Sequence, residues 1–143
     1  MSEVTRMGFE GQIFYGVAGS TATSLLENSR DINTSSENER SETTIRGDSS
    51  GPPKKTESVT LLAFTLEFQM VNDSTDALLT ALLEAEATGT AVAIRTVDYA
   101  AGKGFDGDCT LVKSDPKPLN GEQVITFTAT PTRDGGRTWQ PYV

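Results

Sequence analysis

The sequence contains no histidine and only one cysteine. Histidine is the commonest general base and metal ligand, so its absence excludes the Ser-His-Asp and Cys-His schemes of nucleophilic catalysis. The single cysteine, Cys109, has no partner for an intrachain disulfide and lies at an apolar position of a predicted strand, as a small buried hydrophobe would. No paired carboxylates, nucleophile or metal cluster stands out. We therefore predict no catalytic residue, no metal and no cofactor, and expect that the protein is not an enzyme.

Long hydrophobic runs are also absent, and basic residues are few. Hydrophobic residues make up 36% of the 143 residues, and no segment is long enough and uninterrupted enough to span a bilayer. The opening segment, MSEVTRMGFEGQ, has no apolar run of the kind found in signal peptides, so we expect synthesis in a cytoplasm. With 12 basic and 20 acidic residues, the net charge is −8. This balance argues against ordinary nucleic-acid binding, but it permits a surface past which nucleic acid slides without sticking.

One stretch, residues 28–58, contains only two hydrophobic side chains, Ile32 and Ile45. Its Ser, Glu, Lys and Pro content is typical of a disordered insert. Its threonines and alternating charges instead favour two exposed polar strands with a turn near residues 47–53. Ordering such a stretch costs roughly 1–2 kcal/mol per residue in backbone entropy, which two isoleucines cannot offset within one monomer. A third possibility is that it becomes ordered against another chain.

Most of the remaining sequence shows the two-residue periodicity of antiparallel strands. In residues 58–71, apolar side chains alternate from Leu62 to Met70, while Thr65, Glu67 and Gln69 lie on the opposite face. The last strong strand places Ile125, Phe127 and Ala129 inside and Thr126, Thr128 and Thr130 outside. The predicted strands cover residues 10–17, 23–36, 37–46, 58–71, 90–99, 105–113 and 122–131.

Residues 73–89 form the one convincing helix of the sequence. Asp73 or Ser74 can cap its start, Gly89 can end it, and leucines and alanines form an apolar stripe. The terminal aromatics Trp139 and Tyr142 are expected to fold back onto the core. The predicted fold is mainly β, an antiparallel β-sandwich or partly open barrel with one flanking α-helix, in a single domain over residues 1–143.

The order of these pieces resembles that of the tail tube proteins (major tail proteins) of tailed bacteriophages, which are related to the tube proteins of type VI secretion. The resemblance covers residues 10–132 and rests on element order and on the segments SVTLLAFTLEFQMVND, STDALLTALLEAEATG, TAVAIRTVD and PLNGEQVITFTATP. It implies a tail-tube-like fold, hexameric rings, and stacking of the rings around a lumen that conducts genomic DNA into the host. It also implies location in the virion after synthesis in the cytoplasm of the host bacterium.

The resemblance also implies partners and positions for the contacts. The partners are further copies of the chain and other tail proteins, such as the tape measure, the tail tip and the terminator, while DNA passes without sequence-specific binding. Residues 28–58 sit where a long arm reaches the adjacent ring, and the candidate contact residues are Arg30, Ile32, Glu37, Glu39, Arg40, Glu42, Ile45 and Arg46. The candidate lumen-facing residues, taken from the outward parity of three strands, are Glu67, Gln69, Asp106, Asp108, Thr126 and Thr128.

Other classes of protein fit part of these observations. A tube subunit of a type VI-like secretion or contractile injection system would have the same fold but pass effector proteins. A head–tail connector or decoration protein would form one ring or a trimer without polymerising. An unrelated carbohydrate- or ligand-binding β domain would be monomeric, with a pocket containing Trp139 or the tyrosines.

Overall fold

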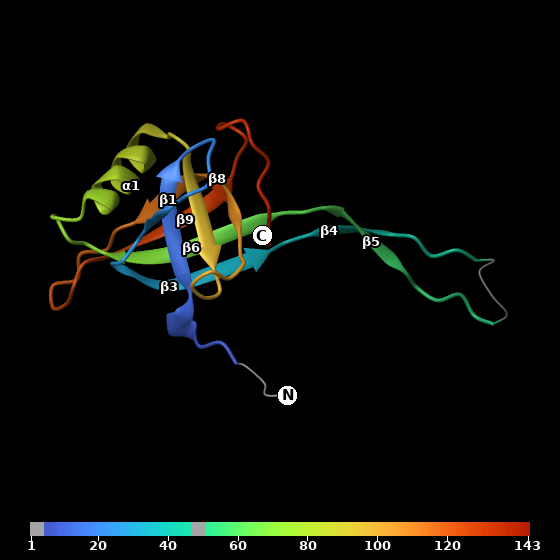
Figure 1. Ribbon diagram of the computed structural model, residues 1–143. Coiled ribbons are helices and arrows are strands. Elements are labelled where there is room, and N and C mark those ends of the chain that lie inside the picture. The colour runs from blue at the N-terminus through green and yellow to red at the C-terminus, as the bar shows by residue number, and fades with distance from the viewer. Residues whose placement is uncertain (1–4, 47–50) are drawn as a thin grey trace.

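The computed structural model describes residues 5–46 and 51–143, and one long hairpin projects from the sheet and helix that form the body (Figure 1). A seven-stranded antiparallel sheet of order β2-β1-β7-β8-β9-β6-β3 forms the body, and β4 and β5 pair in the hairpin. The predicted mainly β architecture with one flanking helix is confirmed. The elements are η1 (Gly8–Glu10), β1 (Gln12–Val17), β2 (Ser24–Leu25), β3 (Ser29–Ser36), β4 (Glu39–Glu42), β5 (Glu57–Leu61), β6 (Phe64–Val71), α1 (Ala77–Thr88), β7 (Val92–Val97), β8 (Asp106–Ser114) and β9 (Val124–Pro131).

The sheet curves so that β1 and β7 cross in front of β6 and β9, and the core lies between these two layers (Figure 1). β8 joins the layers, because its first half pairs with β7 and its second half pairs with β9. The end strands β2 and β3 do not pair with each other, so the barrel stays open along one side.

The strand predicted over residues 58–71 is interrupted near Leu62. Its second part, β6, has the expected alternation, with Leu66, Phe68 and Met70 fully buried. Phe68 stacks on Phe127 of β9 at a ring-centroid distance of 5.4 Å. Leu62 was expected on the same inward face but is 57% exposed, because the chain has left the body there and entered the hairpin.

Helix α1 begins later than predicted, and its cap is Asp76 rather than Asp73 or Ser74. The Asp76 side chain accepts a hydrogen bond from the Leu78 backbone N–H at 3.0 Å and another from Asn28 Nδ2 at 2.9 Å. Gly89 ends the helix in the left-handed conformation, with φ of 70°, as predicted. Over residues 5–46 and 51–143, no helix is long and apolar enough to cross a membrane.

The C-terminal segment turns back along the start of β8. Backbone hydrogen bonds join Gln140 to Asp106 and Val143 to Gly104. The predicted fold-back of Trp139 is confirmed, because its ring lies 6.0 Å from that of Phe105, within the core. Tyr142, by contrast, is 63% exposed, with its hydroxyl 3.5 Å from an Asp98 carboxylate oxygen.

Candidate assembly surfaces

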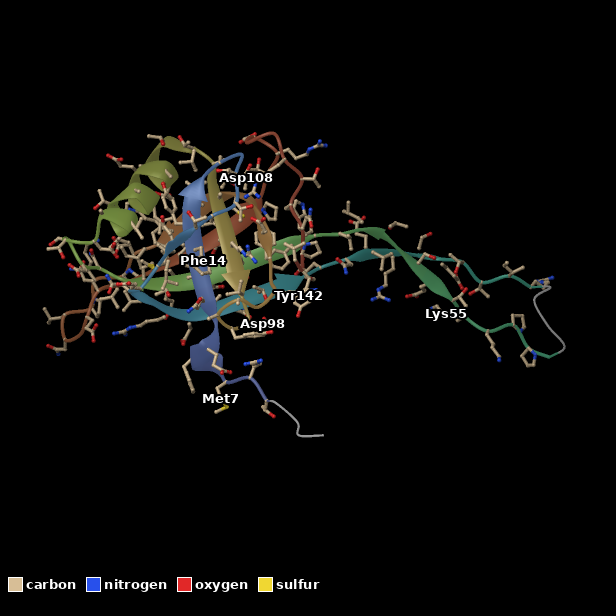
Figure 2. The ribbon with its side chains drawn as sticks, in the orientation of Figure 1. Met7, Phe14, Lys55, Asp98, Asp108 and Tyr142 are labelled. Carbon is tan, nitrogen blue, oxygen red and sulfur yellow. The ribbon has the colours of Figure 1, made fainter. Side chains whose placement is uncertain are left out.

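Residues 37–46 and 51–63 run as the two sides of a twisted hairpin that extends away from the body (Figures 1 and 2), and residues 37–63 are called the arm below. It starts where the body sheet ends, with the Glu37 N–H donating to the Ala63 carbonyl at 3.0 Å. β4 and β5 pair antiparallel, and Thr43 and Thr56 close the next step with hydroxyls 2.7 Å apart. The two polar strands predicted within residues 23–46 are present as β3 and β4, whereas the returning strand β5 falls mostly within the strand that was predicted over residues 58–71. The disordered-insert alternative does not hold for the described residues. The predicted turn at 47–53 lies partly outside them.

Within its described residues, the arm has no buried side chain and contributes none to the hydrophobic core. Every residue of β4 and β5 is exposed, and both strands are held only by each other. Large apolar side chains are nevertheless placed on it: Ile45 is 66% exposed, Leu61 51% and Leu62 57%. A two-stranded hairpin is at best marginally stable alone in water. The arm therefore carries surface that a partner is expected to cover.

The predicted arm boundaries are wrong at both ends. Residues 29–36 form β3, which pairs with β6 in the body sheet, and the returning half of the arm continues to residue 63. Arg30 consequently lies in the body, where its Nη2 is 2.8 Å from Glu122 Oε2, and Ile32 packs against the core. The contact roles of these two residues remain predictions. The other predicted contact residues lie on the arm: Glu37, Glu39, Arg40, Glu42, Ile45 and Arg46.

The outward face of β3, β6, β9 and β8 is a continuous polar surface, called the polar sheet face below. Four candidate lumen residues meet there, since Glu67 pairs with Thr128 and Gln69 pairs with Thr126 in adjacent strands. Hydroxyl and amide groups dominate the residues given below for this face, and Glu67 is the one charged residue among them. The face consists of Asn33, Ser35, Thr65, Glu67, Gln69, Thr110, Val112, Ser114, Thr126, Thr128 and Thr130.

The four strands behind the polar sheet face leave backbone edges open on both sides. Within the described parts of the chain, β3 pairs only with β6, and the end of β8 after Cys109 pairs only with β9. Unpaired strand edges favour pairing with another chain. The four-strand layer can therefore be extended at either side by strands of neighbouring copies.

Asp106 and Asp108, the other two candidate lumen-facing residues, do not lie on the polar sheet face. Both have the predicted outward parity, but the loop that follows β9 folds over them. Asp108 is fully buried. The alternation of side chains along a strand predicts which face of the sheet a side chain lies on. It does not predict whether a loop covers that face.

The covering loop places Arg137 between the two carboxylates. Its Nε donates to Asp108 Oδ1 at 2.9 Å, and its Nη1 donates to Asp106 Oδ1 at 3.1 Å. Asp108 Oδ2 accepts from the Gly19 N–H at 3.0 Å, and Gly19 has φ of 97°, which favours glycine. The two carboxylates raise the pKa of Arg137, although its burial opposes this. The cluster joins the turn after β1, strand β8 and the C-terminal segment.

Cys109 is fully buried beside this cluster, as predicted. Burial, and then the neighbouring Asp108 charge, raise the pKa of the thiol to about 12. The pKa of a thiol in an unfolded chain is about 8.5. Between pH 8.5 and 12 the native state therefore keeps the thiol proton, whereas the unfolded chain releases it. We expect this group to stabilise the fold fully below pH 8.5 and to lose that contribution as the pH rises towards 12, by about 5 kcal/mol in total.

Urea unfolding of wild type and Cys109→Ala at pH 8, 9 and 10 checks this expectation. The wild type should lose more stability with rising pH than the variant, and its thiol should react with a disulfide reagent only when urea is present. Equal pH dependence of the two proteins, or rapid labelling of the native thiol, would contradict it.

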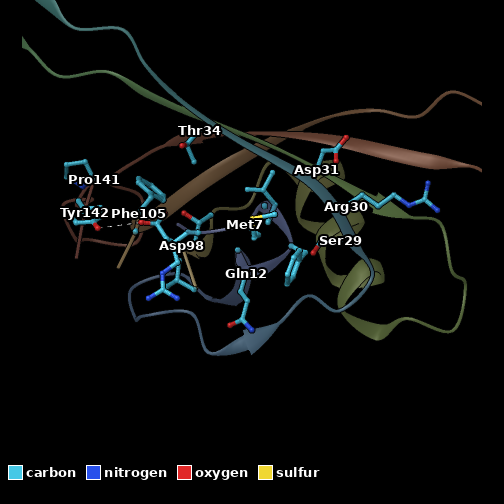
Figure 3. Close-up of a pocket in the computed structure, with 18 of the residues that line it drawn as sticks. Met7, Gln12, Ser29, Arg30, Asp31, Thr34, Asp98, Phe105, Pro141 and Tyr142 are labelled. Atoms are coloured by element: carbon cyan, nitrogen blue, oxygen red, sulfur yellow. Dashed lines mark hydrogen bonds between the residues drawn. The ribbon is translucent and has the colours of Figure 1, made fainter. Parts of the chain in front are cut away.

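An open cleft of about 950 Å³ runs along the free edge of β3 (Figure 3). One wall is β3, including Ile32, and the other is η1 with the start of β1. Arg6 holds the N-terminal wall in place, with its guanidinium 3.6 Å from the centre of the Tyr99 ring. Phe9 is 84% exposed near the opening. The sequence gives no sign of this cleft, because β1 and β3 are brought together only by the curvature of the sheet.

No family description matches the chain, and no curated protein matches its sequence. Several solved structures share its fold, among them the following three. A chain in the tail of an empty GTA particle, obtained by helical refinement with C6 symmetry, matches with a TM-score of 0.72 and 13% identity, covering 96% of this chain and 98% of that one. A chain in the virion of a native gene transfer agent (GTA) particle matches with a TM-score of 0.68 and 9% identity, covering 97% and 99%. The SPP1 tail tube, determined by solid-state NMR and cryo-EM, matches with a TM-score of 0.64 and 12% identity, covering 88% and 75%.

At these identities the likeness concerns the fold. The chain has the fold seen in tail tubes over nearly its whole described length. The resemblance that the order of elements indicated is confirmed at this level.

Proposed function

We propose that the chain is the structural, non-enzymatic subunit of a phage-type tail tube and that it acts in the virion. The arm is the observation that carries this proposal. A hairpin whose strands β4 and β5 are exposed throughout and pair only with each other, and which carries exposed apolar side chains, has no evident role in a monomer, but it can hold adjacent rings together. The tail-tube fold of the body supports the same reading.

The open edges of the four-strand layer provide the ring contact in this proposal. The free edge of β3 in one copy faces the free end of β8 in the next, and six copies close the ring, as the C6 symmetry of the similar GTA tail suggests. Closure would pair edges that are otherwise open. It would also join the polar sheet faces of the copies into one inner wall.

The inner wall suits the passage of DNA. Its threonine, serine and amide groups offer no positive charge to hold phosphate, and Glu67 would add one carboxylate per subunit around the lumen. Like charges repel at close range, so the DNA would slide instead of binding. Other tail proteins, such as a tape measure inside the tube and a terminator and tip at its ends, complete the proposed set of partners. Synthesis takes place in the cytoplasm of the host.

Negative-stain electron microscopy of the purified chain over a concentration series tests this function. We expect hollow tubes or stacked rings of uniform width, with rings that show six-fold averages. Adding double-stranded DNA in molar excess over the subunit should not change the length distribution of the tubes, because their outer and inner surfaces carry net negative charge. Monomeric particles at every concentration, with or without a preformed tail tip added as initiator, would count against the proposal.

A further inference from the structure

Charge is distributed unevenly along the arm. Its far part, residues 44–56, holds three basic residues, Arg46, Lys54 and Lys55, and one acid in the sequence. Its near part holds four acids and one base. Figure 2 shows Lys55 well away from the body. The arm therefore carries a basic end, called the arm tip below, on an acidic stem, while the body carries a net charge of −7 by the same count.

Helix α1, at the end of the molecule away from the arm, carries two carboxylates and no basic residue. Helix α1 lies on the side of the body away from the arm (Figure 1), and no Lys or Arg occurs between Lys55 and Arg95. Glu84 of the helix is exposed and Glu86 is partly exposed, and neither takes part in an ion pair within the described residues. The outer face of α1 is otherwise made of small residues, such as Ala77, Thr80 and Ala87, so nothing bulky shields the carboxylates.

The length of the arm suits a contact across a neighbouring body. The ten residues 37–46 in extended conformation span about 33 Å. A body of roughly 116 residues is about 35 Å across. An arm that leaves one copy at its base can therefore reach the far side of the copy beside it.

We propose that the arm tip of one copy docks on the outer face of α1 of a second copy, in the next ring, through ion pairs of Lys54, Lys55 and Arg46 with Glu84 and Glu86. This inference rests on the proposed tube function and assigns the surface that receives the arm. The two surfaces are different, so the contact is head-to-tail and repeats without closing, as stacking requires. The acidic stem would be repelled by the acidic body, which leaves the tip as the attractive part of the arm.

A charge-swap experiment tests the docking. The tip variant is Lys54→Glu/Lys55→Glu, the helix variant is Glu84→Lys/Glu86→Lys, and the swap variant contains all four changes. The tip variant and the helix variant are each expected to raise the concentration needed for tube formation at least tenfold. The swap variant is expected to restore that concentration to within threefold of the wild-type value. Lysines near the C-terminal end of α1 are compatible with the helix dipole, so the helix variant should fold, as circular dichroism would check.

The matched control is Glu27→Lys/Asp134→Lys, which changes the net charge as much as the helix variant does but at exposed positions outside α1. It should assemble like the wild type. If wild-type tubes form but the helix variant assembles normally, or the swap variant fails to recover, the docking is wrong while the tube function stands. If the wild type never associates, both proposals fall. Wild-type stacking should also weaken steeply between 50 and 500 mM salt, because exposed ion pairs are screened.

Discussion

Replacing residues 37–63 with an Asn-Gly turn is expected to give a folded subunit that forms single rings but no tubes. Ser36 and Phe64 are paired across β3 and β6, so a two-residue turn can join them in the existing register. The removed segment contributes nothing to the hydrophobic core, whose members all lie in the body. The free energy of unfolding should therefore change by no more than about 1 kcal/mol, the range of a surface loop change.

The measurement combines thermal unfolding with electron microscopy and sedimentation of the arm-deleted variant. Excess variant mixed with wild type supplies a control for its ability to form lateral contacts, because rings that lack arms should cap growing tubes and shorten them. Two results would contradict the account. An unfolded product would show that the arm belongs to the core, and tubes of normal length would show that stacking uses another surface.

The parts of the fold that were predicted correctly depend on local sequence. The alternation in β6 and β9 identifies the buried residues Leu66, Phe68 and Ile125, because side chains two apart share a face of the strand. Gly89 marks the end of the helix for an equally local reason, its left-handed backbone. The start of the helix was misplaced because Asp73, Ser74 and Asp76 are all suitable caps. The choice of Asp76 depends on Asn28, which is 48 residues away in sequence.

The errors in the candidate sites come from contacts between distant segments. Arg30 and Ile32 look like part of a polar arm until the pairing of β3 with β6 places them in the body sheet. Asp108 looks exposed until the C-terminal loop covers it. Nothing in the pattern around Arg137, GGRTW, indicates that its guanidinium reaches carboxylates 29 and 31 residues earlier. Four lumen candidates were grouped correctly on one face because parity fixes the face when no loop covers the strand.

Substituting Arg137 by Met is expected to have the largest effect of any single change on stability. Met fills a similar apolar volume but leaves Asp108 fully buried without its cation and with only the Gly19 N–H as a donor. Removing one partner of a buried ion pair costs about 3–5 kcal/mol. For a chain of this size, such a loss corresponds to a fall in Tm of roughly 10–20 °C.

Thermal and urea unfolding of Arg137→Met, Asp108→Asn and the double variant test this role. Arg133→Met is the matched control, since it lies on the same loop but is exposed, and it should change stability by less than about 0.5 kcal/mol. Because each single change leaves the other charge poorly compensated, the double variant should lose less stability than the sum of the two single variants, by at least about 1 kcal/mol. Additive losses would mean that the two side chains stabilise the fold independently. We expect the Arg137→Met protein to be destabilised but still to assemble at low temperature, because the cluster lies inside one chain. That result would show that the cluster stabilises the subunit and does not take part in contacts between subunits.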